Sequence, residues 1–175
     1  MADFRRRLAI AALSRTDGQP LPVLSVEHLC IGSVGCAVSA AVLRAAGITH
    51  TLCVGEGVLP PPQEIVAELG LTHCHFGVKD TPESDICSIF EPCFAFIEEC
   101  KRLHGRVLVY CFQGKSRSVT VAAAYLMKYY GLSFVSALET IRQTRPIASP
   151  NLGFTVVLRR YERELVSSTE EGKPE

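Results

Sequence analysis

The feature that most constrains the fold is a run of four apolar residues, Val-Leu-Val-Tyr, at positions 107–110. A strand without a polar residue on either face is typical of parallel sheets that are covered on both sides. Helical patterns of apolar residues flank this run in the sequence, at residues 89–103 and 117–130. Strands that alternate with helices form parallel sheets. The sequence therefore predicts an α/β fold, with a central, mostly parallel, twisted sheet of about five strands and helices on both faces.

The rest of the chain continues the alternation of strands and helices. We expect strands at residues 23–26, 29–31, 51–54, 72–78 and 107–110. We expect helices at residues 39–46, 60–69, 89–103, 117–130, 133–144 and 152–165. These elements assign residues 21–166 to one domain, which the length of 175 residues also favours. Residues 1–20 are predicted to form a flexible arm, and the polar residues 167–175 a disordered tail.

Charge and cysteine content restrict the class of function. The chain has 18 basic and 18 acidic residues, whereas binding to nucleic acid or to an anionic membrane needs a basic surplus. We therefore expect no nucleic-acid and no membrane partner. The eight cysteines lie mostly in apolar segments, and the amino terminus shows no secretory signal pattern. These features favour a reducing compartment, so the expected localisation is cytoplasmic, nuclear or both.

The candidate site is the segment that joins the central strand to the next helix. Cys111 ends the strand and Arg117 begins the helix, with a glycine-containing turn between them. Cys100 and Arg106 have the same spacing, but they lead from the end of a helix into a strand. A turn that opens a helix binds anions, because its backbone N–H groups converge and the helix dipole adds positive charge. The position between a strand and a following helix therefore makes Cys111 and Arg117, and not Cys100 and Arg106, the candidate anion site.

The chemistry of this turn suits a phosphate group. The field of a helix N-terminus stabilises a cysteine thiolate, which makes Cys111 a candidate nucleophile. Arg117 can hold two phosphate oxygens through its guanidinium fork, and Ser118 can donate a hydrogen bond to the sulfur when it leaves. Gly114 allows the tight turn. The predicted phosphate-binding residues are Phe112, Gln113, Gly114, Lys115, Ser116 and Arg117.

The turn allows two other interpretations. Gly114-Lys115-Ser116 resembles the end of a nucleotide-binding P-loop, but Val109 stands where that motif requires glycine. A buried structural cysteine beside an ordinary arginine is the second alternative. It does not account for the glycine and the serines in the turn.

Residues 23–164 resemble the atypical dual specificity phosphatases, whose phosphate loop has the pattern His-Cys-x-x-Gly-x-Ser-Arg-Ser. Here residues 110–118 read Tyr-Cys-Phe-Gln-Gly-Lys-Ser-Arg-Ser. Further matches lie at residues 29–33, 47–50, 124–127, 132–133, 137–138, 145–147, 150–154 and 161–162. The resemblance implies an enzyme that hydrolyses phosphotyrosine and phosphoserine or phosphothreonine on proteins. It implies phosphorylated proteins as partners, and neither a metal nor an organic cofactor.

The resemblance also implies roles for individual residues. Cys111 would attack phosphorus to form a cysteinyl-phosphate that water hydrolyses. Asp80 would be the general acid, because it opens the polar loop after an expected strand. Asp85 is the competitor, which we interpret as an acid at a helix N-terminus. Asn151, in the pattern Pro-Asn-x-Gly-Phe, would support the phosphate loop or else only cap a helix.

Tyr110 departs from the family pattern, which has histidine before the nucleophile. Histidine can favour the thiolate electrostatically, whereas tyrosine cannot become a cation near neutral pH. We therefore keep a pseudophosphatase or weakly active phosphoprotein-binding adaptor as an alternative. A phosphatase of a non-protein phosphomonoester is another, although the neutral chain and the single Lys115 in the loop do not favour a polyanionic substrate.

Three further features allow a functional and a structural interpretation. Cys53 ends a strand that we expect beside residues 107–110, so it is either a redox partner of Cys111 or a small buried residue. Some members of the family carry such a resolving cysteine. His73 and His75 flank Cys74, but alternation along a strand separates them from it, which predicts no metal site. Residues 5–10 resemble a kinase-docking peptide or a solvated basic helix start.

Overall fold

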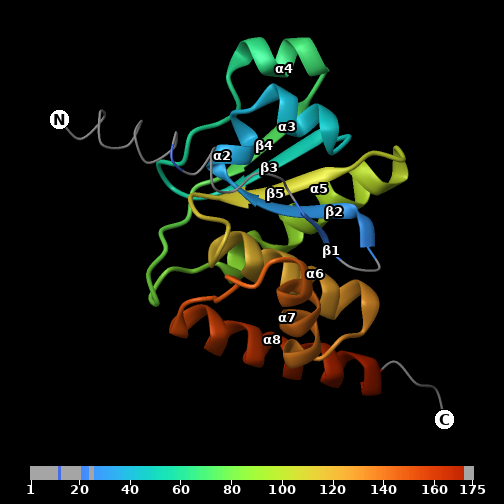
Figure 1. Cartoon of the computed structure of the whole chain (residues 1–175). Coiled ribbons are helices and arrows are strands. Elements are labelled where there is room, and N and C mark those ends of the chain that lie inside the picture. The colour runs from blue at the N-terminus through green and yellow to red at the C-terminus, as the bar shows by residue number, and fades with distance from the viewer. Residues whose placement is uncertain (1–11, 13–20, 24–25, 172–175) are drawn as a thin grey trace.

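The computed structural model describes residue 12, residues 21–23 and residues 26–171. Its centre is a five-stranded sheet with the order β1-β2-β5-β3-β4 (Figure 1). The strands are β1 (Leu21–Val23), β2 (Val26–Ser33), β3 (His50–Val54), β4 (Thr72–Phe76) and β5 (Val107–Cys111). β1 is antiparallel to β2, and the other neighbouring strands are parallel. The predicted α/β class is confirmed.

Helices cover both faces of the sheet (Figure 1). One face carries α2 (Val34–Ala37), α3 (Ala40–Ala45) and α4 (Gln63–Leu69). The other face carries α5 (Phe90–Arg102), α6 (Arg117–Tyr130), α7 (Phe134–Thr144) and α8 (Leu152–Glu171). A short 3₁₀ helix, η1 (Cys87–Ile89), precedes α5. Two hydrophobic cores result, one on each face.

β5 connects the two cores and positions the site. All five of its residues are buried. Val107 and Val109 pack into the core of α5 and α6, whereas Leu108 and Tyr110 pack into the core of α2 and α3. β5 lies between β2 and β3, and its carboxyl end is Cys111. In open α/β sheets ligands bind outside the carboxyl ends of the strands, which is where this arrangement puts Cys111.

Apart from shifts in the ends of elements, such as α4, which begins at Gln63 and not at residue 60, and β4, which ends at Phe76 and not at residue 78, three parts of the fold differ from the sequence prediction. Residues 23–26 are not one strand, because Val23 ends β1 and Val26 begins the eight-residue β2. The short helix α2 was not predicted; it begins after Ser33, whose Oγ accepts a hydrogen bond from the Gly35 N–H at 3.1 Å. α8 continues to Glu171, so the residues 167–171 of the predicted tail are helical.

The remaining predictions on the ends of the chain concern residues outside the described part. They are the arm at residues 1–20, apart from residue 12, and with it the docking peptide at residues 5–10. Among the helices of the described residues, none combines the length and the apolar character that crossing a bilayer would need.

Candidate active site

The predicted phosphate-binding loop is a turn between β5 and α6. β5 ends at Cys111 and α6 begins at Arg117. The backbone φ angle of Gly114 is 65°, in the left-handed region that favours glycine. A Cβ atom at this position would lie 2.3 Å from the Gly32 carbonyl oxygen and 2.6 Å from Arg145 Nη2. Backbone conformation and lack of space therefore both require glycine at position 114.

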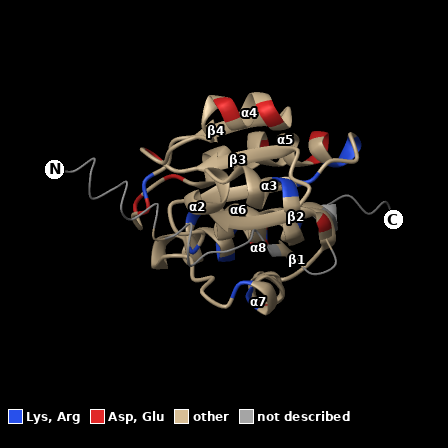
Figure 2. Ribbon diagram, turned by 45° about the horizontal axis from the view of Figure 1, so that its top comes forward, with Lys and Arg blue, Asp and Glu red and all other residues tan. Residues whose placement is uncertain are grey.

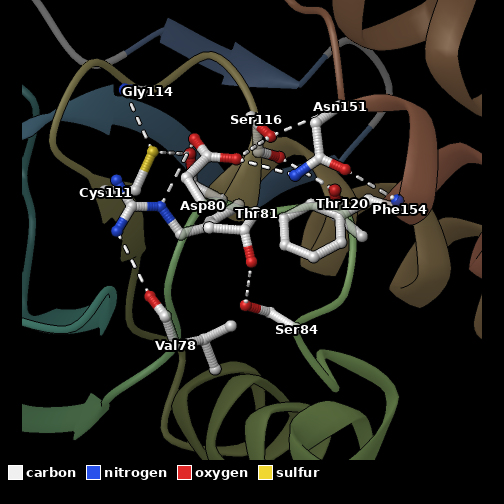
Figure 3. A network of polar contacts seen from close by, with 12 residues as sticks. Val78, Asp80, Thr81, Ser84, Cys111, Gly114, Ser116, Thr120, Asn151 and Phe154 are labelled. Atoms are coloured by element: carbon white, nitrogen blue, oxygen red, sulfur yellow. Dashed lines mark hydrogen bonds and ion pairs between the residues drawn. The ribbon is translucent and has the colours of Figure 1, made fainter.

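Cys111 lies on the floor of this turn, with 1% of its surface exposed. Its Sγ accepts a hydrogen bond from the Gly114 N–H at 3.2 Å and lies 3.3 Å from Ser118 Oγ (Figure 3). The N-terminus of α6 adds the positive end of a helix dipole. A thiolate can only accept hydrogen bonds, so in that state the Ser118 hydroxyl donates to it. The setting suits a nucleophilic thiolate.

Arg117 is nearly buried beside the thiol, with 8% of its surface exposed. Its Nη1 donates to the Val78 carbonyl oxygen at 3.3 Å, and a Cβ atom at Gly55 would lie 2.7 Å from Nη1. Its Nε is 3.5 Å from Asp80 Oδ2 but has no hydrogen-bond acceptor among the described residues. Leaving a buried N–H without an acceptor is costly, which suggests that a bound anion supplies one.

Asp80 belongs to a junction of three segments (Figure 3). Its Oδ1 accepts hydrogen bonds from Ser116 Oγ at 2.7 Å and from Asn151 Nδ2 at 2.9 Å. The Asn151 N–H donates to Ser116 Oγ at 3.1 Å, and Asn151 Oδ1 accepts from the Phe154 N–H at 2.9 Å. Asn151 thus caps the first turn of α8 and also connects the loop of Asp80 to the phosphate-binding loop. The two expectations for Asn151 are compatible.

The loop that carries Asp80 packs closely on α8. A Cβ atom at Gly153 would lie 1.9 Å from the Pro82 carbonyl oxygen, so the backbones touch at this point. Asp85 lies elsewhere: its Oδ1 accepts a hydrogen bond from the Ser88 N–H at 3.2 Å, at the start of η1. The structure therefore brings Asp80, and not Asp85, next to Arg117.

The far side of the turn is held by residues that sequence reasoning missed. Arg145 is buried; its Nη2 donates to the Gln113 carbonyl oxygen at 2.8 Å and its Nε to that of Gly114. The Ser149 N–H donates to the Lys115 carbonyl oxygen at 2.8 Å. Both donors lie at or after the end of α7. Arg145 stands in one of the matched segments, which was the signal that could have drawn attention to it.

These elements surround a cavity of about 330 Å³. Its lining residues are Asp80, Cys111, Phe112, Gln113, Lys115, Ser116, Arg117, Ser149, Pro150 and Asn151. Most of the predicted site residues thus share one cavity, while Gly114 from the loop and Ser118 from the first turn of α6 contact the Cys111 sulfur. Lys115 and Arg117 supply positive charge to the lining of this cavity, and Asp80 supplies a carboxyl group.

Comparison with known proteins decides the family. Residues 29–164 match the family described as the dual specificity phosphatase catalytic domain. The chain belongs to the dual specificity phosphatase family. It is 37% identical over 161 residues to dual specificity protein phosphatase 1 of Arabidopsis thaliana, which covers 91% of this chain and 77% of that protein. It is also 37% identical over 157 residues to human dual specificity phosphatase 28, covering 89% and 86%.

A solved structure agrees with this assignment. The crystal structure of human DUSP28 matches with a TM-score of 0.76 at 33% identity, covering 85% of this chain and 99% of that one. Membership of the family implies dual specificity phosphatase activity and phosphoprotein substrates.

Tyr110 and Cys53 lie behind the phosphatase loop rather than in the cavity. Tyr110 is fully buried, and its hydroxyl donates to the Leu59 carbonyl oxygen at 3.1 Å. Cys53 is its neighbour across the β3–β5 register. Burial raises the pKa of the Tyr110 phenol, and burial raises the pKa of the Cys53 thiol to about 12, although a hydrogen bond with Tyr110 lowers it in part. Tyr110 is therefore a neutral hydrogen-bond donor on the α2–α3 side of the sheet.

The histidines of β4 have protein partners. His73 Nδ1 lies 2.9 Å from Thr51 Oγ1, and His75 Nε2 lies 2.8 Å from the Gly55 carbonyl oxygen. Burial lowers the pKa of His73, which favours the neutral imidazole. Cys74 packs into the opposite core. In the part of the chain that the structure describes, no group of three or more His, Cys, Asp or Glu side chains is arranged to hold a metal ion.

Proposed function

We propose that this dual specificity phosphatase hydrolyses phosphotyrosine and phosphoserine or phosphothreonine in proteins through a cysteinyl-phosphate on Cys111. One observation supports the proposal most strongly: Cys111, whose sulfur accepts a hydrogen bond from the loop, Arg117 and Asp80 line the same cavity. Nucleophile, anion clamp and proton donor are the three groups that phosphoryl transfer to a cysteine needs.

In the first step the Cys111 thiolate attacks phosphorus, and the bond from phosphorus to the ester oxygen breaks. The phosphoryl oxygens occupy the turn, where they accept from the loop N–H groups and from the Arg117 guanidinium. Asp80, protonated at this stage, gives its proton to the leaving oxygen. Ser116 and Asn151 orient the Asp80 carboxyl group, since both donate to its Oδ1.

In the second step water attacks the cysteinyl-phosphate, and the phosphorus–sulfur bond breaks. The Asp80 carboxylate takes a proton from the water, so that phosphate is released and the acid is restored. The sulfur leaves as a thiolate. Ser118 Oγ, at 3.3 Å from Cys111 Sγ, and the Gly114 N–H, at 3.2 Å, donate to the charge that develops on it.

A second candidate function is a phosphoprotein-binding adaptor of low turnover. The observation that favours it is Tyr110, which lies before the nucleophile as a buried, neutral phenol and cannot supply positive charge to the sulfur. The phosphate-binding loop and Arg117 would serve such an adaptor equally well.

Turnover of a small aryl phosphate by the purified protein tests the proposal. We expect release of one phosphate per phenol, and a Cys111 peptide that gains the mass of one phosphoryl group when the reaction is quenched in acid. Tight binding of phosphopeptides without turnover, and without phosphorylation of Cys111, would support the adaptor instead.

We also propose that the protein works in a reducing compartment, the cytoplasm or the nucleus. All eight cysteines lie within the described residues, and each is a free thiol. Free buried thiols are usual in such compartments, whereas oxidising ones favour disulfides. Imaging of the tagged protein in cells tests this; a location in the secretory pathway would contradict it.

A further inference from the structure

A second cavity opens directly beside the active site. It has a volume of about 340 Å³ and lies between α7 and α8. Ser149 and Pro150 line both this cavity and the catalytic one, so the two share a rim. We call the second cavity the α7–α8 groove. A phosphorylated side chain in the catalytic cavity would bring the residues next to it over this rim, because an extended peptide advances by about 3.3 Å per residue.

The α7–α8 groove combines an apolar floor with positive charge. Phe134 and Leu138 are buried side chains of the floor. Arg142 and Arg159 line the groove, whereas Glu139 is its one acidic side chain. Figure 2 shows basic residues of the ribbon near α7, at the end of the molecule opposite the acidic residues of α4. The local charge is positive although the whole chain is neutral.

Both arginines are held in place without the help of a carboxylate. Arg142 Nε donates to the Ala148 carbonyl oxygen at 2.9 Å. The guanidinium of Arg159 lies over the Phe134 ring, 5.3 Å from its centroid. Among the described residues neither arginine forms an ion pair, in contrast to the adjacent Arg160, whose Nε lies 3.4 Å from Glu164 Oε1. Oriented arginines without an acidic partner are suited to bind a carboxylate from another molecule.

We propose that the α7–α8 groove is a substrate subsite that binds an acidic residue close to the phosphorylated residue of the phosphoprotein. This rests on the proposed phosphatase function and adds sequence selectivity to it. Arg159 and Arg142 bind the acidic side chain, and the floor of Phe134 and Leu138 packs against its neighbour. The cationic groups of both cavities then form one continuous surface for an anionic peptide: Lys115, Arg117, Arg142 and Arg159.

The test uses phosphotyrosine peptides in which one aspartate is moved through the positions flanking the phosphotyrosine of an otherwise neutral sequence. We expect one or two positions to raise kcat/KM by about 1.5-fold to fivefold, the range for exposed ion pairs. Arg159→Gln should remove most of this gain but should leave turnover of a small aryl phosphate, which does not reach the groove, unchanged. Arg160→Gln is the matched control, because it removes the same charge from an exposed site outside the groove; it should keep the gain.

Reversing the charge of Arg159 tests the subsite through a new preference, which a misfolded protein would not show. Arg159→Glu should shift the preference from aspartate to lysine at the same peptide position. The proposal is overturned if no position matters in the wild-type protein, or if Arg160→Gln costs as much as Arg159→Gln. Should the wild-type protein not turn over the aryl phosphate, the proposed function fails. The subsite is then judged separately by fluorescence anisotropy with the same peptides, where the same pattern of preferences is expected and a flat pattern overturns it.

Discussion

Cys100–Arg106 and Cys111–Arg117 have the same spacing and lie at opposite ends of β5. The first pair leads from the last turn of α5 into β5, and the second leads from β5 into α6. Burial raises the pKa of the Cys100 thiol to about 11, and Arg106 Nη1 donates to the Ala46 carbonyl oxygen at 2.9 Å. The end of a helix presents carbonyl oxygens, which repel an anion, whereas its beginning presents N–H groups. Chain direction therefore decides which pair can bind phosphate.

The largest expected difference between the two pairs is the effect on turnover of replacing the cysteine. Cys111→Ser should abolish turnover of an aryl phosphate, because a serine hydroxyl is a far weaker nucleophile than a thiolate. Phosphate or vanadate should still bind, since the loop N–H groups and Arg117 remain; a rise in melting temperature on adding vanadate measures this. Cys100→Ser is the matched control, and its turnover per folded molecule should equal that of the wild-type protein. Substantial residual turnover by Cys111→Ser would refute the assignment.

The second difference concerns the general acid, since Asp80 Oδ2 lies 3.5 Å from Arg117 Nε of the Cys111 pair. Asp80→Asn should lower kcat by about 10²–10⁴-fold for a substrate with a poor leaving group, the usual cost of losing a general acid. The loss should shrink for an ester of a strongly acidic phenol, which leaves without protonation. Asp85→Asn, whose side chain binds the Ser88 N–H, should have little effect. A larger loss from Asp85→Asn would mean that Asp85 is the acid.

The loop of Asp80 depends on a close approach to α8, which gives a smaller effect. In Gly153→Ala the new Cβ atom would lie 1.9 Å from the Pro82 carbonyl oxygen, so the loop of Asp80 has to shift. We expect kcat to fall by about tenfold, since moving a catalytic group by less than about 1 Å from its productive position already slows the reaction. As for Asp80→Asn, the loss should shrink with an acidic leaving phenol. Gly77→Ala is the control, because a Cβ atom there meets nothing within 4 Å. Equal losses with both leaving groups would indicate general damage instead.

Sequence reasoning located the part of the site that is local in the chain. Cys111, the loop and Arg117 are consecutive, so spacing and element order were sufficient to find them. Arg145 and Ser149 contact the same loop from a segment about 30 residues away, as the 31-residue separation of Arg145 and Gly114 illustrates. Such contacts depend on how α7 packs on α6, which no local pattern records. The helical continuation of α8 beyond residue 165 was missed because its apolar periodicity stops there.

A still smaller effect is expected from adding positive charge behind the Cys111 loop. Tyr110→His should move the pH midpoint of Cys111 alkylation downward, since an imidazolium favours a nearby thiolate. Burial opposes the charged imidazole, and nucleophilicity falls with basicity, so turnover near neutral pH should rise by only about twofold to tenfold. Tyr110→Phe separates charge from packing, because it removes only the hydroxyl that donates to the Leu59 carbonyl. Unchanged alkylation profiles for Tyr110→His would show that position 110 does not influence the thiol.

The smallest effect is expected from replacing Cys53. Cys53→Ser should leave turnover of the reduced enzyme unchanged and affect only the recovery of the enzyme from oxidation. Peroxide converts the Cys111 thiolate to a sulfenic acid; attack by the Cys53 thiolate on that sulfur then forms a disulfide and expels hydroxide, which takes a proton from the solvent to become water. Cys53 pairs with Tyr110, one residue before Cys111, but the strand alternation puts the two thiols on opposite faces of the sheet. Because burial raises the pKa of the Cys53 thiol to about 12, very little of Cys53 is a thiolate at pH 7.

Bridge formation should therefore be slow and should accelerate by about tenfold per pH unit, because the thiolate fraction of Cys53 grows by that factor below its pKa. Peptide mapping after mild peroxide treatment at pH 7 and pH 9 measures the yield of the Cys53–Cys111 peptide. Cys53→Ser should reduce the activity that a reductant restores, since the sulfenic acid then proceeds to irreversible sulfinic acid. Cys100→Ser again serves as the control, because Cys100 lies at the other end of β5. If Cys111 pairs with another cysteine, or if Cys53→Ser recovers as fully as the wild-type protein, Cys53 is a small core residue and no more.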